Sequence, residues 1–250
     1  MYAQNILNND HIEEDVEDKN TIYKKQEHIE KKPIRPTPLR EADVMWSRKI
    51  WREIDLRQKI NHAFYYPMNS GNKNDVNPSE DRKSLIDVIY DGIMEGSITA
   101  YSNETRAQFD DEFRVEMTAS EMKEIGNSEK VIEELYDEAL IAQGVDPELA
   151  IKYDTSFIPF NRNTIKKWRV KEEWFFDKQR SVMDVRIIGL APMQENETED
   201  GRLLGTFSPI FWVWFPEARK ILINAEVFNL VKNDAERRTY DDIFWKRMFS

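Results

Sequence analysis

The sequence predicts an α+β fold: N-terminal helices packed on an aromatic-rich antiparallel sheet, with a closing C-terminal helix. Three observations lead to it. Apolar residues recur at helical spacing in residues 41–96, they alternate with polar residues in 166–176, and they run almost without interruption in 207–215. The chain has 250 residues, of which 40% are hydrophobic and 12% aromatic. A chain of this size and composition buries about 70% of its unfolded surface, so a substantial core is expected.

Residues 1–40 are predicted to form a disordered, acidic, proline-containing arm. The segment has few large apolar residues, so burial cannot offset the entropy of ordering its backbone. Its acidic run and its prolines are Asp10, Glu13, Glu14, Asp15, Glu17, Asp18, Pro33, Pro36 and Pro38. Two interpretations stay open: a solvated leader, and an arm that becomes ordered on a partner. Residues 41–250 are predicted to form one α+β domain.

Two helices are expected at the start of this domain. Val44, Met45, Ile50, Trp51 and Ile54 fall on one helical face, and the pattern continues through Leu56 and Ile60 to Pro67. Asn69–Pro78 is a loop by its turn residues. Ser84 caps the second helix, which ends at Gly96, and a short strand follows at Ile98–Tyr101.

An acidic excursion from the domain is expected at about residues 102–155. Residues 102–154 contain 15 acidic and 5 basic residues, a net charge of −10, which is most of the −11 of the whole chain. Thr118–Glu121 has the spacing of a capping box. Val131, Leu135, Ala139 and Ile141 predict an acidic helix that stops at Gly144.

The second half of the chain is predicted to supply the sheet. Lys166–Phe176 and Val182–Leu190 form an antiparallel hairpin around the polar turn Asp177–Arg180. Phe207–Phe215 is a strand buried on both faces and bounded by Pro216, and Ile221–Ile223 is a further strand. Asn233 or Asp234 caps a final helix. Its inward stripe is Tyr240, Ile243, Phe244 and Met248.

Composition excludes several classes of protein. The net charge of −11 argues against a nucleic-acid binder, which needs an excess of Lys and Arg. The absence of cysteine excludes disulfides and thiolate metal sites, and no glycine motif forms a phosphate-binding loop. No stretch of 18 apolar residues predicts a membrane-spanning helix. Ala3-Gln4 resembles the end of a cleaved signal peptide.

The candidates for catalysis and metal binding are weak. Glu195–Gly201 resembles half of an EF-hand loop, but Phe207 stands where the bidentate carboxylate is required. Asp110, Asp111 and Glu112 are consecutive, so their side chains diverge, and structural or solvent-facing roles are expected. His62 lies among aromatic residues and is expected to be packed. We therefore predict no catalytic residue, no cofactor and no metal site.

Two clusters are better candidates for a protein interface, one aromatic and one basic. Adjacent aromatic residues cannot all point into one core unless both faces of the sheet are covered, by helices or by another protein. The basic residues are either paired within the chain or complementary to a partner of opposite charge. The candidate interface residues are Trp168, Trp174, Phe175, Trp212, Trp214, Arg162, Lys166, Lys167 and Arg169.

Three segments together resemble one family. They are WSRKIWREIDLRQKINHAFYYP, KKWRVKEEWFFDKQRSVMDVRIIGLAP and FWVWFPEARKILINAEVFNLVKNDAERRTYDDIFWKRMF. In this order they resemble the GldN/PorN family of gliding-motility and type IX secretion proteins, over roughly residues 41–100 and 160–250. Residues 110–155 match poorly.

The resemblance implies a non-enzymatic periplasmic subunit at the inner face of the outer membrane. It would assemble with a GldK/PorK-type lipoprotein into a ring and contact the periplasmic shaft of a GldM/PorM-type motor protein. It also favours a removed signal peptide and implies no catalytic motif. Two alternatives remain: a carbohydrate-binding (peptidoglycan-binding) module that stacks sugars on exposed tryptophans, and a hydrolase with a site around His62.

Overall fold

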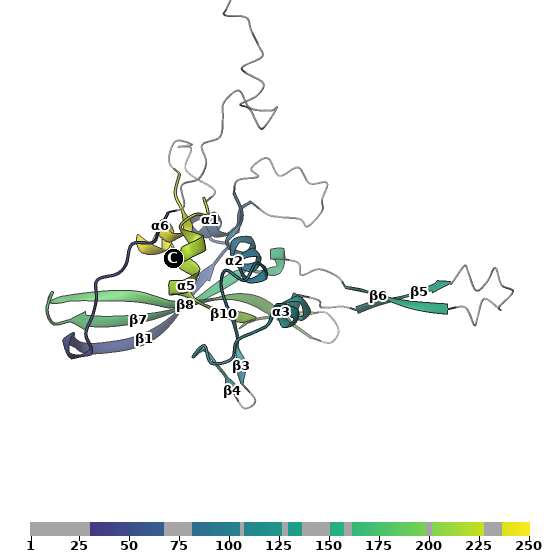
Figure 1. The fold of residues 1–250 in the computed structure, drawn as a ribbon, viewed down its shortest axis with the longest axis horizontal. Coiled ribbons are helices and arrows are strands. Elements are labelled where there is room, and N and C mark those ends of the chain that lie inside the picture. The colour runs from purple at the N-terminus through teal and green to yellow at the C-terminus, as the bar shows by residue number, and fades with distance from the viewer. Residues whose placement is uncertain are drawn as a thin grey trace, which may run out of the picture. The chain divides into compact units, whose positions relative to one another are not determined.

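The protein has the predicted α+β architecture in a computed structural model (Figure 1). The chain divides into two units, residues 1–31 and residues 32–250. The structure describes residues 31–67, 82–105, 108–126, 130–136, 151–157, 162–198, 202–227 and 237–250. Residues 1–30 of the predicted arm, the predicted loop at 69–78, and Asn233 and Asp234 lie outside these ranges. Residues 31–40, the rest of the predicted arm, are described and have no regular secondary structure.

A six-stranded antiparallel sheet forms the centre of the domain. The strand order is β1 (Val44–Asp55), β7 (Lys167–Asp177), β8 (Val182–Glu197), β10 (Phe211–Trp214) and β2 (Ala100–Ser102), and β9 (Leu203–Pro209) pairs with β8 beside this path. β1 pairs with β7 along its whole length, and β7 pairs with β8 along its whole length. β1, β7 and the first half of β8 therefore make a long three-stranded ribbon.

Four helices pack on one face of this sheet (Figure 1). They are α1 (His62–Tyr65), α2 (Leu85–Met94), α5 (Phe215–Leu222) and α6 (Tyr240–Trp245). Their apolar residues form one core with sheet residues such as Ile54, Trp168, Val170 and Leu190. Single-turn 3-10 helices lie at Glu41–Asp43, Lys59–Asn61 and Arg162–Thr164. We call this side of the sheet the helix face and the other side the opposite face.

The acidic excursion contains α3 (Ala119–Gly126) and two small hairpins. One hairpin pairs β3 (Glu104–Thr105) with β4 (Gln108–Phe109), and the other pairs β5 (Lys130–Tyr136) with β6 (Ile151–Phe157). The helix predicted from Val131 and Leu135 is therefore wrong, because those residues lie in a strand. Ala139, Ile141 and Gly144 lie outside the described residues.

The helix predicted at residues 44–60 is also wrong over most of its length, because Val44–Asp55 is strand β1. Its apolar residues lie at positions that suit a helical stripe as well as an edge strand. Pairing with β7 decides between the two, since tertiary contacts override a weak local preference. Only the 3-10 turn Lys59–Asn61 and the short α1 that follows it are helical here.

The segment 207–223 differs from its prediction as well. Phe207–Phe215 is two strands rather than one, because Ile210 separates β9 from β10, and Phe215 already begins α5. Ile221 lies inside α5, so no strand forms at Ile221–Ile223. Pro216 explains the change of structure: its fixed φ suits the first turn of a helix, where no donor is lost.

Other predictions are confirmed. The β7–β8 hairpin turns at residues 178–181, where the Asp177 carboxylate accepts hydrogen bonds from two backbone amides of the turn. Ser84 caps α2 by accepting from the amide of Asp87, and Gly96 follows the helix with a φ of +75°. The capping box at the start of α3 is present, with Thr118 and Glu121 bonded reciprocally. The predicted final helix is present as α6, but its predicted cap is wrong: the helix begins only at Tyr240 and is capped by Thr239 rather than by Asn233 or Asp234.

Hydrogen bonds between side chains and backbone groups hold the two ends of the described domain. Asn61 is fully buried; its amide nitrogen donates to the carbonyl of Ser250, and its Oδ1 accepts from the Ser250 amide. At the other end, Arg219 donates to the carbonyl of Ile34 and Arg186 donates to the carbonyl of Thr37. Residues 34–37 are therefore fixed to the domain ahead of β1.

Candidate protein-binding surface

Three of the five predicted aromatic interface residues are core residues. Trp168 is 1% exposed and packs under the helices, whereas Phe175 and Trp212 are buried on the opposite face. Arg186 covers Phe175, with its guanidinium 5.3 Å from the ring centroid, and Phe113 packs edge-on against Trp212. Both faces of the sheet are thus covered here by the chain itself. These three side chains are at most 3% exposed, so they offer almost no surface to a partner protein.

Trp174 and Trp214 remain candidates. Trp174 is half-buried on the helix face, and Trp214 is 44% exposed at the end of β10. Val213 of β10 points into the core on the helix face. Because side chains alternate along a strand, Trp212 and Trp214 both lie on the opposite face. That these residues contact another protein stays a prediction.

The predicted basic cluster is paired within the chain. Arg162 forms ion pairs of 2.7 Å with Asp87 and 3.0 Å with Asp91, and the Nζ of Lys166 donates to the hydroxyl of Tyr65 at 2.7 Å. Lys167 and Arg169 both reach Glu53, at 3.3 Å and 2.8 Å. The hydrogen bond from Arg169 lowers the pKa of the Glu53 carboxyl. These cations have internal partners, which favours the first of the two interpretations considered for them.

A buried carboxylate holds Trp174 in place, and no sequence motif marks it. Glu172 is fully buried; it accepts from the Trp174 indole at 3.0 Å and from Arg247 at 2.8 Å, and Arg52 lies 3.9 Å away. Arg247 follows α6, so this network ties the C-terminal segment to the middle of the sheet. An alternating strand pattern places Glu172 on the same face as Trp174, which is the only sequence signal for it.

The ribbon of β1, β7 and β8 extends beyond the helices (Figure 1). It carries exposed large apolar side chains there. The strand register places Trp46, Phe176 and Met183 in one row across the helix face. Trp46 is 46% exposed and Met183 is 58% exposed. We define the outer apolar patch as Trp46, Ile50, Trp174, Phe176, Met183 and Val185. Neighbours in such rows have Cβ atoms about 4.5–5.5 Å apart. Trp174 and Val185 share the next row with the charged Arg48, and Ile50 shares the row after that with the buried Glu172.

Most of this patch is not predicted from the sequence, because the segment that contains Trp46 and Ile50 is predicted to be a helix rather than strand β1. As a helix, the segment would bury its apolar stripe. As a strand at the edge of a sheet, it exposes apolar side chains on both faces. The only residue that the prediction and the patch share is Trp174.

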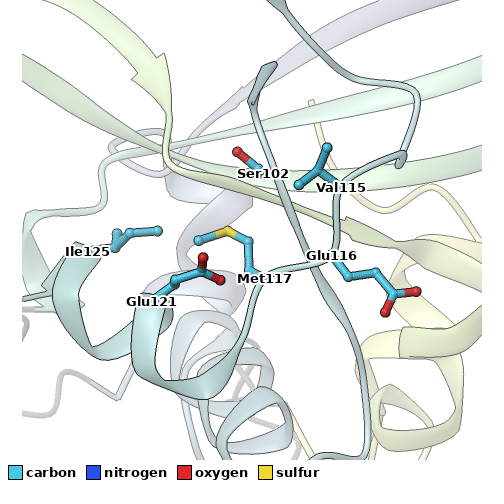
Figure 2. A pocket seen from close by; sticks show the side chains of 6 residues that line it. All are labelled: Ser102, Val115, Glu116, Met117, Glu121 and Ile125. Atoms are coloured by element: carbon cyan, nitrogen blue, oxygen red, sulfur yellow. The ribbon is translucent and has the colours of Figure 1, made fainter. Parts of the chain in front are cut away.

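A shallow pocket of about 410 Å³ lies between β2 and α3 (Figure 2). Met117 extends toward Ile125 and Glu121, whereas Glu116 points away from them (Figure 2). The Glu121 carboxylate accepts from the amide and the hydroxyl of Thr118, and these bonds lower its pKa. That carboxylate is therefore committed to capping α3 and is a poor general base.

A second hollow, of about 390 Å³, lies on the opposite face of the sheet. Its lining combines aromatic and charged residues: Trp51, Asn103, Asp110, Asp111, Arg169, Phe207, Ser208, Pro209 and Trp212. Asp111 accepts from the Trp51 indole at 2.7 Å and lies 3.3 Å from Lys171. An aromatic wall with polar neighbours is typical of pockets that bind small ligands.

The candidate catalytic residues Asp110, Glu112 and His62 make structural contacts within the chain. Asp110 accepts from the amide of Glu112, and Glu112 pairs with Arg114, so neighbouring carboxylates have separate partners. His62 packs edge-on against Tyr66 with ring centroids 5.4 Å apart and lines neither of the two hollows described above. Within the described ranges, no cluster of three or more His, Cys, Asp or Glu could hold a metal ion. No described helix is long and apolar enough to span a bilayer.

Comparison with known families decides the class of the protein. Residues 39–250 match the family described as "Gliding motility associated protein GldN". The chain belongs to the GldN family. The match spans both the ribbon and the acidic excursion, including residues 110–155, which the sequence comparison above describes as matching poorly. No curated protein matches the chain.

Membership of the GldN family makes this chain a component of the gliding-motility and type IX secretion machinery. The GldN family is a structural component of that machinery and not a known enzyme family. The features of interest in this GldN protein are therefore its contact surfaces, above all the outer apolar patch.

Proposed function

We propose that this GldN protein is a non-enzymatic subunit of a periplasmic ring. It assembles with further copies and with a GldK/PorK-type lipoprotein at the inner face of the outer membrane, and it contacts the shaft of a GldM/PorM-type motor protein. The outer apolar patch carries this proposal, since monomeric proteins rarely leave such a surface open to water.

The energetics suit a subunit of an assembly. Complete burial of one large apolar side chain contributes about 1.5–3 kcal/mol, so covering Trp46, Ile50 and Met183 gives a useful but modest affinity. In a closed ring each further contact is effectively intramolecular, so modest contacts suffice to hold many copies together.

Co-purification with the lipoprotein tests the proposal. The double substitution Trp46→Ser with Met183→Ser removes two exposed members of the patch, so the variant should fold normally and bind the lipoprotein at least tenfold more weakly. Leu203→Ser with Leu204→Ser is the matched control, since both leucines are exposed on β9. Wild-type affinity in the Trp46–Met183 variant would show that the patch is not the contact, and absence of any complex would reject the lipoprotein as partner.

Cell fractionation tests the proposed location separately. The protein should be released with periplasmic contents, or sediment with outer membranes when the lipoprotein is present. Recovery in the cytoplasmic fraction would contradict the periplasmic assignment without bearing on the patch.

The second candidate function is peptidoglycan binding, favoured by the aromatic hollow on the opposite face. Trp51 is the exposed aromatic residue there, so Trp51→Ala should abolish sedimentation with purified peptidoglycan. Trp245→Ala, at another exposed tryptophan, is the control. Failure of the wild-type protein to sediment would exclude this candidate.

A further inference from the structure

Strand β1 leaves one of its two edges open. It is the first strand in the order of the main sheet and pairs with β7 alone among the described strands (Figure 1). It is 12 residues long, about twice the usual length of a strand. The backbone donors and acceptors of its outer edge are therefore available to another strand.

The side chains of β1 make this edge unusual. All residues from Met45 to Trp51 are exposed, and four of these seven side chains are large and apolar. Natural edge strands are normally short, charged, bulged or covered, since an open apolar edge recruits other chains. A bulge is present at Met45, but the strand beyond it pairs regularly with β7 and is not interrupted.

The same stretch carries two cations that have no anionic partner among the residues that the structure describes. Arg48 and Lys49 are exposed, and neither forms an ion pair with a described residue. The stretch Met45–Trp51 contains no acidic residue, although the whole chain has a net charge of −11. An acidic ligand would thus meet a local positive charge at this edge.

We propose that the open edge of β1 binds an extended, acidic and apolar segment of a partner protein as an added strand. Backbone hydrogen bonds along Met45–Trp51 supply the affinity, and Arg48 and Lys49 select carboxylates. The side chains of the added strand would lie beside Trp46 and Ile50 on one face and Trp51 on the other. The inference rests on the proposed role as an assembly subunit, and it adds how one partner docks.

Charge argues against a second copy of β1 as the occupant. Antiparallel pairing of two β1 strands about the centre of the exposed stretch would place Arg48 directly opposite Arg48 of the other copy. Like charges directly opposite one another destabilise a strand pair. An acidic segment of a different protein has no such repulsion.

Peptide binding to the full-length protein tests this docking mode. The probe is a nine-residue capped peptide of alternating valine and glutamate, and its match has lysine in place of glutamate. A third peptide keeps the glutamates but carries N-methyl groups on alternate backbone nitrogens, which block strand pairing. The glutamate peptide should bind at least tenfold more tightly than either of the others. It should also slow hydrogen exchange within Val44–Asp55.

Charge reversal supplies the matched variants. Arg48→Glu with Lys49→Glu should invert the preference so that the lysine peptide binds more tightly. Lys123→Glu with Lys220→Glu makes the same change in net charge at two exposed helix positions and should leave the preference unchanged. Equal binding of the three peptides, no binding at all, or protection confined to another strand would each overturn the proposal.

This result is separable from that of the co-purification experiment. If the lipoprotein binds but the peptides do not, the assembly role stands and edge docking is wrong. If the peptides bind to β1 but no lipoprotein complex forms, the edge is a strand acceptor and the lipoprotein is not the partner.

Discussion

Arg219 and Asp241 form a two-pronged buried ion pair that joins α5 to α6. The Arg219 Nε donates to Oδ1 at 2.6 Å and Nη2 donates to Oδ2 at 2.9 Å, while Nη1 donates to the Ile34 carbonyl. One guanidinium thus fixes two helices and the segment ahead of β1. Its planar fork, rather than its charge alone, makes these three contacts possible.

Replacing Arg219 by lysine should therefore be costly although the charge is kept. A lysine cannot satisfy both carboxylate oxygens and the carbonyl, and breaking a buried pair typically costs about 3–5 kcal/mol. Urea unfolding measures the change in free energy. Arg57→Lys, in the exposed pair with Asp55, is the control and should cost far less, because exposed ion pairs contribute little to stability. Equal losses in the two variants would contradict this account.

Gly189→Ala should destabilise the protein because the new methyl group meets a ring. A Cβ at this position would lie 2.4 Å from Cζ of Phe113 and 3.2 Å from the carbonyl oxygen of Val213. Overpacking of this kind typically costs about 1–3 kcal/mol. Adding Phe113→Leu should restore part of the loss, which thermal unfolding of the single and double variants would measure. A double variant with the summed loss of both singles would show that the clash is not the cause.

The two tryptophans of β10 should differ sharply on truncation. Trp212→Ala empties a buried site and should cost about 3–5 kcal/mol, whereas Trp214→Ala, at a 44% exposed site, should cost far less. Chemical unfolding of the two variants makes a matched comparison on one face of one strand. If Trp214→Ala alone weakens partner binding, the predicted interface role of that residue gains support.

Stability should fall at alkaline pH because of Tyr240. Burial raises the pKa of its phenol above the usual value of 10, and the hydroxyl donates to the carbonyl of Lys83 at 2.8 Å. The folded state therefore holds this proton more tightly than the unfolded state. The resulting stability is complete below about pH 10 and is lost as the pH rises further, by up to about 1.4 kcal/mol per pH unit.

Tyr240→Phe tests this pH dependence. The variant should be less stable at pH 7, because a hydrogen bond is lost, but its stability should fall less steeply above pH 10. Tyr66→Phe, at an exposed tyrosine, is the control for the slope. Parallel curves for the wild-type and Tyr240→Phe proteins would rule out Tyr240 as the cause.

The elements that the sequence predicts well are those in which local and global signals agree. Alternation in Lys167–Asp177 matches a strand with two neighbours, and the Ser84 cap is satisfied within its own first turn. β1 could not be recognised, because its apolar residues fit a helix equally well and only the distant β7 fixes its form. The sequence does not predict α5, because a proline such as Pro216 can mark the end of a strand as well as the start of a helix.

The candidate surface was harder to predict than the fold. Aromatic residues in adjacent positions indicate that both faces of a sheet are apolar, but not which face the chain covers itself. Phe113, which belongs to the acidic excursion, covers Trp212. The sequence around neither residue predicts this contact. The exposed patch instead includes Trp46 and Met183, whose strands meet only through the register with β7.

The contact of Asn61 with Ser250 has a practical consequence for experiments on this protein. The backbone amide and carbonyl of Ser250 satisfy the side chain of the fully buried Asn61, so displacing Ser250 would leave polar atoms unpaired in an apolar interior. Any reporter attached next to Ser250 should therefore be separated from it by a flexible spacer, so that these two hydrogen bonds can form.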